Sequence, residues 1–295
     1  MKIFSVFGVG ILRILQSFFN KQASRHMSTT ETYLRFGLYF ESVASLFGLC
    51  YLFLAGTGGL NVQTVICAAI KGLLFLLELL TSLVALRSAP LALCTMCSLG
   101  GGIILPTISG IFFFQEPLSL LQWLGVALFF ISAYFMIYSQ NKKQTVSSST
   151  IAVLACNFLI NGLCGILSKY FAIRVENGNA ALFTCLSYAF AALFFGITLL
   201  AIKKSSGFKM SSKPHLPKKL LLFGGMVGIV CASIVYFTTV LSRTVTIVEL
   251  NTVPNAICLV GSLVMGILLF KEKFTVLKFF GVVLSIVSTT VIVLF

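Results

Sequence analysis

The sequence predicts an all-α integral membrane protein of ten transmembrane helices, arranged as two inverted repeats of five helices. Composition, the recurrence of apolar segments and an internal repeat support this prediction. Of the 295 residues, 58% are hydrophobic and only 9% are charged, and the mean hydropathy is +1.06. In an ordinary soluble domain about a quarter of the residues are charged. The composition therefore leaves almost no residues for a soluble domain.

Apolar segments of about 20 residues recur along the chain, and this length crosses roughly 30 Å of hydrocarbon as a helix. Arg13 interrupts the first segment, and no convincing small-residue cleavage site follows it, so we interpret this segment as a retained helix rather than a signal peptide. The breaks between segments are, in order, SRHMSTTE, GTGGLN, RSAP, QEPLS, SQNKKQTVSSS, RVENGN, KKSSGFKMSSKPHLPKK, SRTVT and KEKF. The predicted helices cover residues 3–22, 33–56, 62–86, 90–114, 119–138, 150–173, 180–202, 219–241, 246–270 and 274–295.

The two halves of the chain repeat each other. A shift of 156 residues places GIFFFQEPLSLLQWLGVALFFIS (110–132) on GILLFKEKFTVLKFFGVVLSIVS (266–288). Apolar residues coincide easily between membrane helices, but acids and glycines do not. The coincident residues include Glu116 with Glu272, Gly125 with Gly281, Ser132 with Ser288 and, under a shift of 148, Lys21 with Lys169.

We therefore predict two domains, a first five-helix repeat over residues 1–140 and a second over residues 141–295. Because five is an odd number, the second repeat enters the membrane from the opposite side. Inverted repeats of this kind are typical of secondary transporters.

The closing motifs of the repeats, FQEPLSLLQWLG and FKEKFTVLKFFG, resemble those of the drug/metabolite transporter superfamily, especially its bacterial EamA-like permeases. The resemblance covers nearly the whole chain, and Lys21 and Lys169 are similar to the lysine that often ends the first helix of such repeats. It implies a ten-helix permease in a bacterial plasma (inner) membrane, with a central cavity between the halves for a small-molecule substrate. Membrane lipid is the other expected partner, a homodimer is left open, and no cofactor or metal is implied.

The net charge of +14 arises from 21 Lys and Arg residues against seven acids, all of them Glu. Most cations lie in short loops that follow the odd-numbered helices, so the positive-inside rule accounts for them and nucleic acid is not an expected partner. The same rule places both termini outside the cell. Several members of the superfamily have both termini in the cytoplasm, which is opposite to this prediction.

Polar residues at bilayer depth are costly and are therefore candidates for a substrate site. The first helix of each repeat carries a polar stripe at helical spacing, and we expect the two stripes to line the cavity. Alternatively, the asparagines bridge helices by hydrogen bonding. The first stripe is Arg13, Gln16 and Asn20, and the second is Asn157, Asn161 and Lys169.

Further substrate contacts are expected on three other helices, at Tyr39, Glu41, Tyr236, Asn251 and Asn255. Glu41 and Glu78 are the candidates for coupling to a proton, because a carboxylate withdrawn from water is more easily protonated. Pairing of Glu78 with Lys71, seven residues away on one helix face, is the structural alternative.

Glu116 interrupts an apolar run, but the repeat places it in the tight turn between the fourth and fifth helices. Pro117 suits the start of the fifth helix, and the helix dipole favours a carboxylate near that start. We therefore interpret this stretch as the close of a repeat and expect the chemistry elsewhere.

The function that these features favour is secondary transport of a small polar organic metabolite by alternating access, with proton coupling or facilitated diffusion. The alternatives are a non-transporting membrane assembly or receptor subunit and a membrane enzyme that acts on lipid-linked substrates. The chain contains no Asp, no HExxH motif and no His at membrane depth, so an enzyme is not expected and no catalytic or metal-binding residue is assigned.

Overall fold

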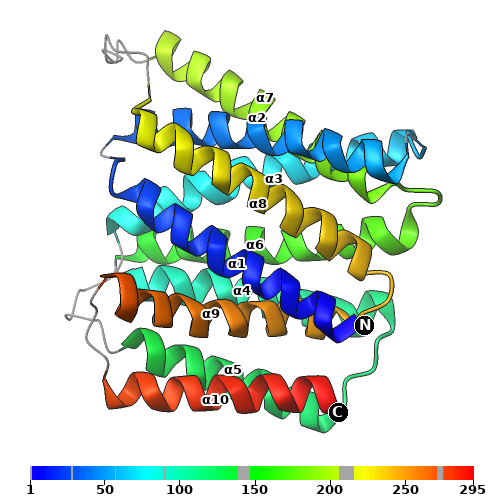
Figure 1. Cartoon of the computed structure of the whole chain (residues 1–295), viewed down its shortest axis with the longest axis vertical. Coiled ribbons are helices and arrows are strands. Elements are labelled where there is room, and N and C mark those ends of the chain that lie inside the picture. The colour runs from blue at the N-terminus through cyan, green and yellow to red at the C-terminus, as the bar shows by residue number, and fades with distance from the viewer. Residues whose placement is uncertain are drawn as a thin grey trace. The chain divides into compact units, whose positions relative to one another are not determined.

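The computed structural model describes residues 2–27, 29–56, 58–88, 91–138, 147–205, 216–270 and 275–295. These residues form ten helices and no strand (Figure 1). Each predicted helix is present, and its ends differ from the prediction by at most three residues. The helices are α1 (Lys2–Ser24), α2 (Thr30–Ala55), α3 (Val62–Ser88), α4 (Leu91–Phe114), α5 (Leu120–Tyr138), α6 (Ser148–Arg174), α7 (Ala180–Ser205), α8 (Lys218–Leu241), α9 (Ile247–Phe270) and α10 (Val276–Leu294).

Seven of the described helices are long and apolar enough to cross a membrane. Large apolar side chains such as Phe53, Phe112 and Leu120 are 75–88% exposed, an arrangement that lipid tolerates and water does not. The chain is therefore an integral membrane protein. The seven segments are Thr30–Ala55, Val62–Ser82, Cys97–Phe114, Ser148–Arg174, Ala180–Lys203, Lys218–Leu241 and Ile247–Met265.

Polar side chains immediately before the helices accept hydrogen bonds from backbone N–H groups of the first turn, which would otherwise lack partners. Ser119 and Gln122 form a reciprocal capping box at α5. The other caps are Thr29 at α2, Asn61 at α3, Ser147 at α6, Asn179 at α7 and Thr246 at α9.

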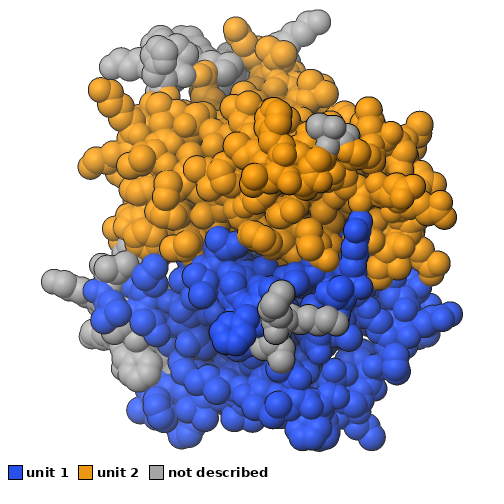
Figure 2. All heavy atoms as spheres, turned by 45° about the vertical axis from the view of Figure 1, so that its right-hand side comes forward, with its two compact units in different colours: residues 1–14, 80–169, 241–295 blue, residues 15–79, 170–240 orange. Residues whose placement is uncertain are grey.

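The chain forms two compact units, each assembled from segments of both predicted domains (Figure 2). Unit 1 contains residues 1–14, 80–169 and 241–295, and unit 2 contains residues 15–79 and 170–240. The repeats are defined by sequence similarity, whereas the units are defined by contacts in the fold, so the units do not test the division into repeats. The two domains therefore remain a prediction from the sequence.

Unit 1 is built around the pairs α5–α10 and α4–α9. The Ser132 hydroxyl donates to the Gly281 carbonyl at 2.7 Å, and the Ser288 hydroxyl donates to the Gly125 carbonyl at 2.7 Å. Residues that increase in number along α5 thus meet residues that decrease along α10, so the two helices are antiparallel, as Figure 1 also shows. A Cβ atom at Gly125 would lie 2.6 Å from Ile292, which explains why this close crossing requires glycine.

In unit 2 the corresponding pair is α2 and α7, which also run antiparallel. A Cβ atom at Gly37 would lie 2.8 Å from the Phe195 ring, and one at Gly48 would lie 2.9 Å from the Cys185 backbone. The Ser45 hydroxyl donates to the Cys185 carbonyl at 3.1 Å. Small residues along α2 therefore allow the two helices to approach closely.

Candidate functional site

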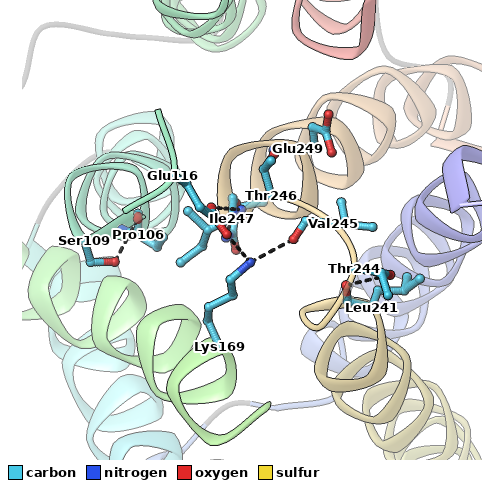
Figure 3. A network of polar contacts seen from close by, with 11 residues as sticks. Pro106, Ser109, Glu116, Lys169, Leu241, Thr244, Val245, Thr246, Ile247 and Glu249 are labelled. Atoms are coloured by element: carbon cyan, nitrogen blue, oxygen red, sulfur yellow. Dashed lines mark hydrogen bonds and ion pairs between the residues drawn. The ribbon is translucent and has the colours of Figure 1, made fainter. Parts of the chain in front are cut away.

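Unit 1 contains a buried ion pair between Lys169 of α6 and Glu116, which lies in the turn between α4 and α5 (Figure 3). The Lys169 ammonium lies 2.5 Å from Glu116 Oε1 and donates to the Val245 carbonyl at 2.8 Å. The other carboxylate oxygen, Oε2, accepts from the backbone N–H of Ile247 at 2.8 Å. The lysine side chain is only 3% exposed and the glutamate side chain 21%. One network thus joins α6, the α4–α5 turn and the start of α9.

The turn that carries Glu116 has a specific backbone geometry. Gln115 has a φ of 53°, in the left-handed region that few residues other than glycine adopt, and the Glu116 N–H donates to the Gly110 carbonyl at 2.9 Å. The sequence places Glu116 in the turn between α4 and α5, and the structure confirms that position. Ser119 is the residue that caps α5, whereas the Glu116 carboxylate is hydrogen-bonded to the start of α9, a contact that the sequence does not predict.

The start of α9 suits a negative charge. Thr246 caps the helix by accepting from the Glu249 N–H, and Glu116 takes the N–H of Ile247, the first helical residue. Free N–H groups and the helix dipole make a helix N-terminus partly positive. Glu116 therefore lies between two positive partners, the Lys169 ammonium and the α9 N-terminus.

Asn251 and Asn255 both belong to α9. Asn251 Nδ2 donates to the Ile247 carbonyl at 2.7 Å, within its own helix. A Cβ atom at Gly165 would lie 3.4 Å from Asn251 Oδ1 and 3.0 Å from Pro106, so α6, α4 and α9 converge one turn before Lys169. Asn255 is 6% exposed.

Asn157 of α6 is a hydrogen-bonding hub. Its Nδ2 donates to the hydroxyls of Thr81 at 3.0 Å and Ser82 at 2.9 Å, and its Oδ1 accepts from Ser98 at 2.5 Å and from Asn161 at 3.3 Å. The amide thus joins α3, α4 and α6 and agrees with the bridging alternative. A role for Asn157 in substrate binding stays a prediction.

Arg13 of α1 is half-buried at the contact between α1 and α9. The Cys258 thiol donates to the Arg13 carbonyl at 3.4 Å, and a Cβ atom at Gly10 would lie 2.8 Å from Ile257. Unit 1 thus contains six predicted site residues: Arg13, Asn157, Asn161, Lys169, Asn251 and Asn255.

The predicted acids Glu41 and Glu78 lie in unit 2. Glu41 is 3% exposed, and its Oε2 has no hydrogen-bond partner within the described residues. Gly37, one turn earlier on α2, lies where a Cβ atom would be 3.1 Å from Leu79 of α3, which places α2 beside the Glu78 region. The Glu78 carboxylate is a charged neighbour of Glu41.

Lys71 of α3 is also 3% exposed, and its ammonium lies 5.3 Å from the centroid of the Phe75 ring. That ring stacks on Tyr188 of α7 with a centroid distance of 5.1 Å. Glu41 therefore lies on a middle turn of α2, and Lys71 and Glu78 lie on middle turns of α3. Two carboxylates and one ammonium leave a net negative charge, which a proton or a bound cation at Glu41 would neutralise.

The other predicted residues of unit 2 do not form one cluster. Gln16 donates to the Cys231 thiol at 3.1 Å, whereas Asn20 is exposed. Tyr39 packs on Gly224 of α8, where a Cβ atom would lie 2.8 Å from its ring. Tyr236 stacks on Tyr51 with a centroid distance of 4.3 Å.

Sequence reasoning missed three polar groups that the structure brings into contact. Tyr51 donates to the Ser233 hydroxyl at 2.8 Å in unit 2, and nothing in the spacing of these residues indicates that contact. The sequence places Glu116 in a turn and indicates no partner for its carboxylate. Its contact with Lys169 could have been anticipated, because the repeat duplicates both an acid and a lysine. Glu272, the sequence counterpart of Glu116, lies outside the described residues.

No protein-family model matches the chain, and no curated protein matches it. The fold is similar to that of a solved protein described only as "Crystal structure of protein", with a TM-score of 0.74 and 16% sequence identity. The similarity covers 97% of this chain and 96% of that chain. At this identity it shows a shared fold and carries no functional information. No group of three or more His, Cys, Asp or Glu residues suited to a metal occurs among the described residues.

Proposed function

We propose that the protein is a secondary membrane transporter that moves a small polar organic metabolite by alternating access. The contact between α5 and α10 carries this proposal. Ser132 bonds to Gly281, and Ser288 bonds to Gly125, so exchanging each residue with its repeat counterpart reproduces the same pair of bonds. A two-fold relation produces such reciprocity, and the antiparallel direction is the one expected of inverted repeats.

The proposal includes ten spans in place of the seven that length and composition identify. The three added helices are α1, α5 and α10, of which the last two have 19 residues each. A helix of that length extends about 28 Å, close to the thickness of the hydrocarbon core. The motifs FQEPLSLLQWLG and FKEKFTVLKFFG favour a permease of the drug/metabolite transporter type.

Buried charge supports a polar substrate. Lys169 and Glu41 are almost completely withdrawn from the surface on apolar helices, where ionisable residues are rare and usually functional. Glu41, whose Oε2 has no hydrogen-bond partner within the described residues, suits an amine of the substrate. A polar metabolite fits a buried carboxylate better than a purely lipophilic compound does. Coupling to a proton is assigned to Glu41, with Glu78 as its charged neighbour.

Reconstitution tests the proposal. Purified protein in liposomes is expected to take up at least one compound from a panel of amino acids, amines and nucleotide sugars, and Glu41→Gln is expected to abolish that uptake. Glu31→Gln is the matched control, because Glu31 pairs with Arg35 near the start of α2. Absence of uptake of every compound would favour a non-transporting membrane assembly. Full uptake by Glu41→Gln would remove Glu41 from the site.

A further inference from the structure

The network of Lys169, Glu116, Val245 and Ile247 joins three elements that are separate in the chain, and we call it the Lys169 latch. We propose that the Lys169 latch is a reversible closure: it holds the start of α9 against α6 and the α4–α5 turn in one state of the protein and opens in the other. This inference rests on the proposed transport cycle.

The Lys169 latch joins the start of α9 to two other elements. The Lys169 ammonium bonds to the Val245 carbonyl just before α9, and Glu116 bonds to the Ile247 N–H at its first turn. Both ends of the ion pair thus bond to the backbone of the same short segment. The α9 start is released from α6 and from the α4–α5 turn when Lys169 and Glu116 separate from that segment and from each other.

The closed and open states of the Lys169 latch differ little in free energy. A buried ion pair gains little net stability, because the two charges lose their hydration. When the pair separates into water, both charges regain that hydration, so the closed and open states lie close in free energy. An apolar contact of the same size would lose stability on opening without such compensation. A charged closure therefore suits an equilibrium that must reverse.

Two of the helices near the Lys169 latch, α4 and α9, each contain an internal proline. Pro254 lies seven residues after Ile247 within α9, and Pro106 lies ten residues before Glu116 within α4. A proline within a helix removes one backbone hydrogen bond and allows the helix to bend there. The segments 107–114 and 247–253 can therefore move relative to the rest of their helices when the latch opens.

Thiol reactivity in the full chain tests the proposal. Ser109 of α4, which is 2% exposed and lies beside the latch, is replaced by Cys in a chain from which the nine native cysteines have been removed (Figure 3). The double variant Glu116→Gln/Lys169→Met removes both charges and leaves no charge unpaired. Minor states are typically populated at about 0.1–10%, so we expect the double variant to raise the rate of maleimide modification about tenfold.

Two controls distinguish the latch from a general loosening of the protein. Glu31→Gln/Arg35→Met removes an ion pair that lies within α2, and it is expected to leave the rate at Ser109→Cys unchanged. A second reporter, Ser187→Cys, replaces a fully buried residue of α7 and is expected to stay protected in the latch variant. Equal rates with and without the latch charges, or equal exposure of both reporters, would overturn the proposal.

Glu116→Gln/Lys169→Gln is the second variant if the first does not give a monodisperse protein, because it also leaves no charge unpaired and glutamine at position 116 still accepts from the Ile247 N–H. The same comparison of rates then decides the question. The measurement needs no substrate. Failure of transport in liposomes would therefore contradict the proposed function, whereas unchanged thiol reactivity would contradict the latch.

Discussion

The two units bury charge in different ways. In unit 1 the Lys169 ammonium has a carboxylate and a carbonyl as partners, and Glu116 has both carboxylate oxygens engaged. In unit 2 Glu41 is 3% exposed, but its Oε2 has no hydrogen-bond partner within the described residues. A buried charge with partners ties elements together, whereas one without partners is available to a ligand or a proton.

The loss of one partner in unit 1 should have the largest effect on stability. Lys169→Met leaves the Glu116 carboxylate in a mostly buried position, with the Ile247 N–H as its one remaining partner among the described residues. We expect the free energy of unfolding in detergent to fall by about 3 kcal/mol, at the low end of the range for broken buried pairs because Glu116 is partly exposed. Adding Glu116→Gln should restore most of this loss. If the double variant were as unstable as Lys169→Met alone, the charge pairing would not explain the effect.

Asn157 is a neutral polar group whose side-chain amide uses both its nitrogen and its oxygen in hydrogen bonds, so it can be compared with the two buried carboxylates. Asn157→Ala removes one hydrogen-bond partner each from Thr81, Ser82 and Ser98 at once. We expect a loss of about 2 kcal/mol, because several part-buried hydrogen bonds are lost together, measured by denaturation in detergent. Asn161→Ala is the matched control on the same helix, since the Asn161 side chain bonds to Asn157 alone within the described residues, and it should cost less. Equal losses would contradict the hub.

Glu41→Gln should show the opposite behaviour. Because Oε2 has no partner to lose, we expect stability to stay within about 1 kcal/mol of the parent protein or to rise, as removal of an unsatisfied buried charge is favourable. Transport, in contrast, should be lost. The two measurements are made on one preparation, by thermal denaturation and by uptake in liposomes. A large loss of stability would place Glu41 among the structural charges.

The smallest effect is expected for the ion pair between Glu31 and Arg35, which joins residues one turn apart on α2 at 2.7 Å. The two side chains are 13% and 22% exposed, so burial does not distinguish this pair from the one at Glu116; it differs in joining two turns of one helix. An i, i+4 pair within a helix contributes roughly 0.5 kcal/mol or less. Glu31→Gln should therefore change neither stability nor uptake measurably. A clear loss in either measurement would mean that a pair within one helix matters as much as a pair that joins separate elements.

Much of the fold could be predicted from the sequence, because hydrocarbon requires backbone hydrogen bonds to be satisfied within each span. The ten helices follow from the recurrence of apolar segments and from the breaks between them. The correspondence of Gly125 with Gly281 and of Ser132 with Ser288 also appears in the sequence. The contact that makes the four residues reciprocal does not, since it depends on how α5 and α10 pack.

The candidate site was less predictable. Spacing places Asn157, Asn161 and Lys169 on one side of α6, but it cannot tell which of them already have partners. Asn157 bonds to three hydroxyls from α3 and α4, residues that are 59 to 76 positions away in the sequence. The tertiary structure thus assigns Asn157 to bridging and Lys169 to the ion pair with Glu116.

By itself, the sequence determined the helical class, the helix boundaries, the insertion in a membrane and the duplicated motifs, because each depends on local composition and periodicity. Only the tertiary structure decided the partners of the buried charges. Glu116 lies in a turn, and its role depends on α6 and on the start of α9, which meet it through packing of distant segments. The sequence places Glu41 within a helix and Glu116 in a turn, but it does not show the partners of either carboxylate. What separates them is the number of donors that folding brings within hydrogen-bonding distance of each carboxylate.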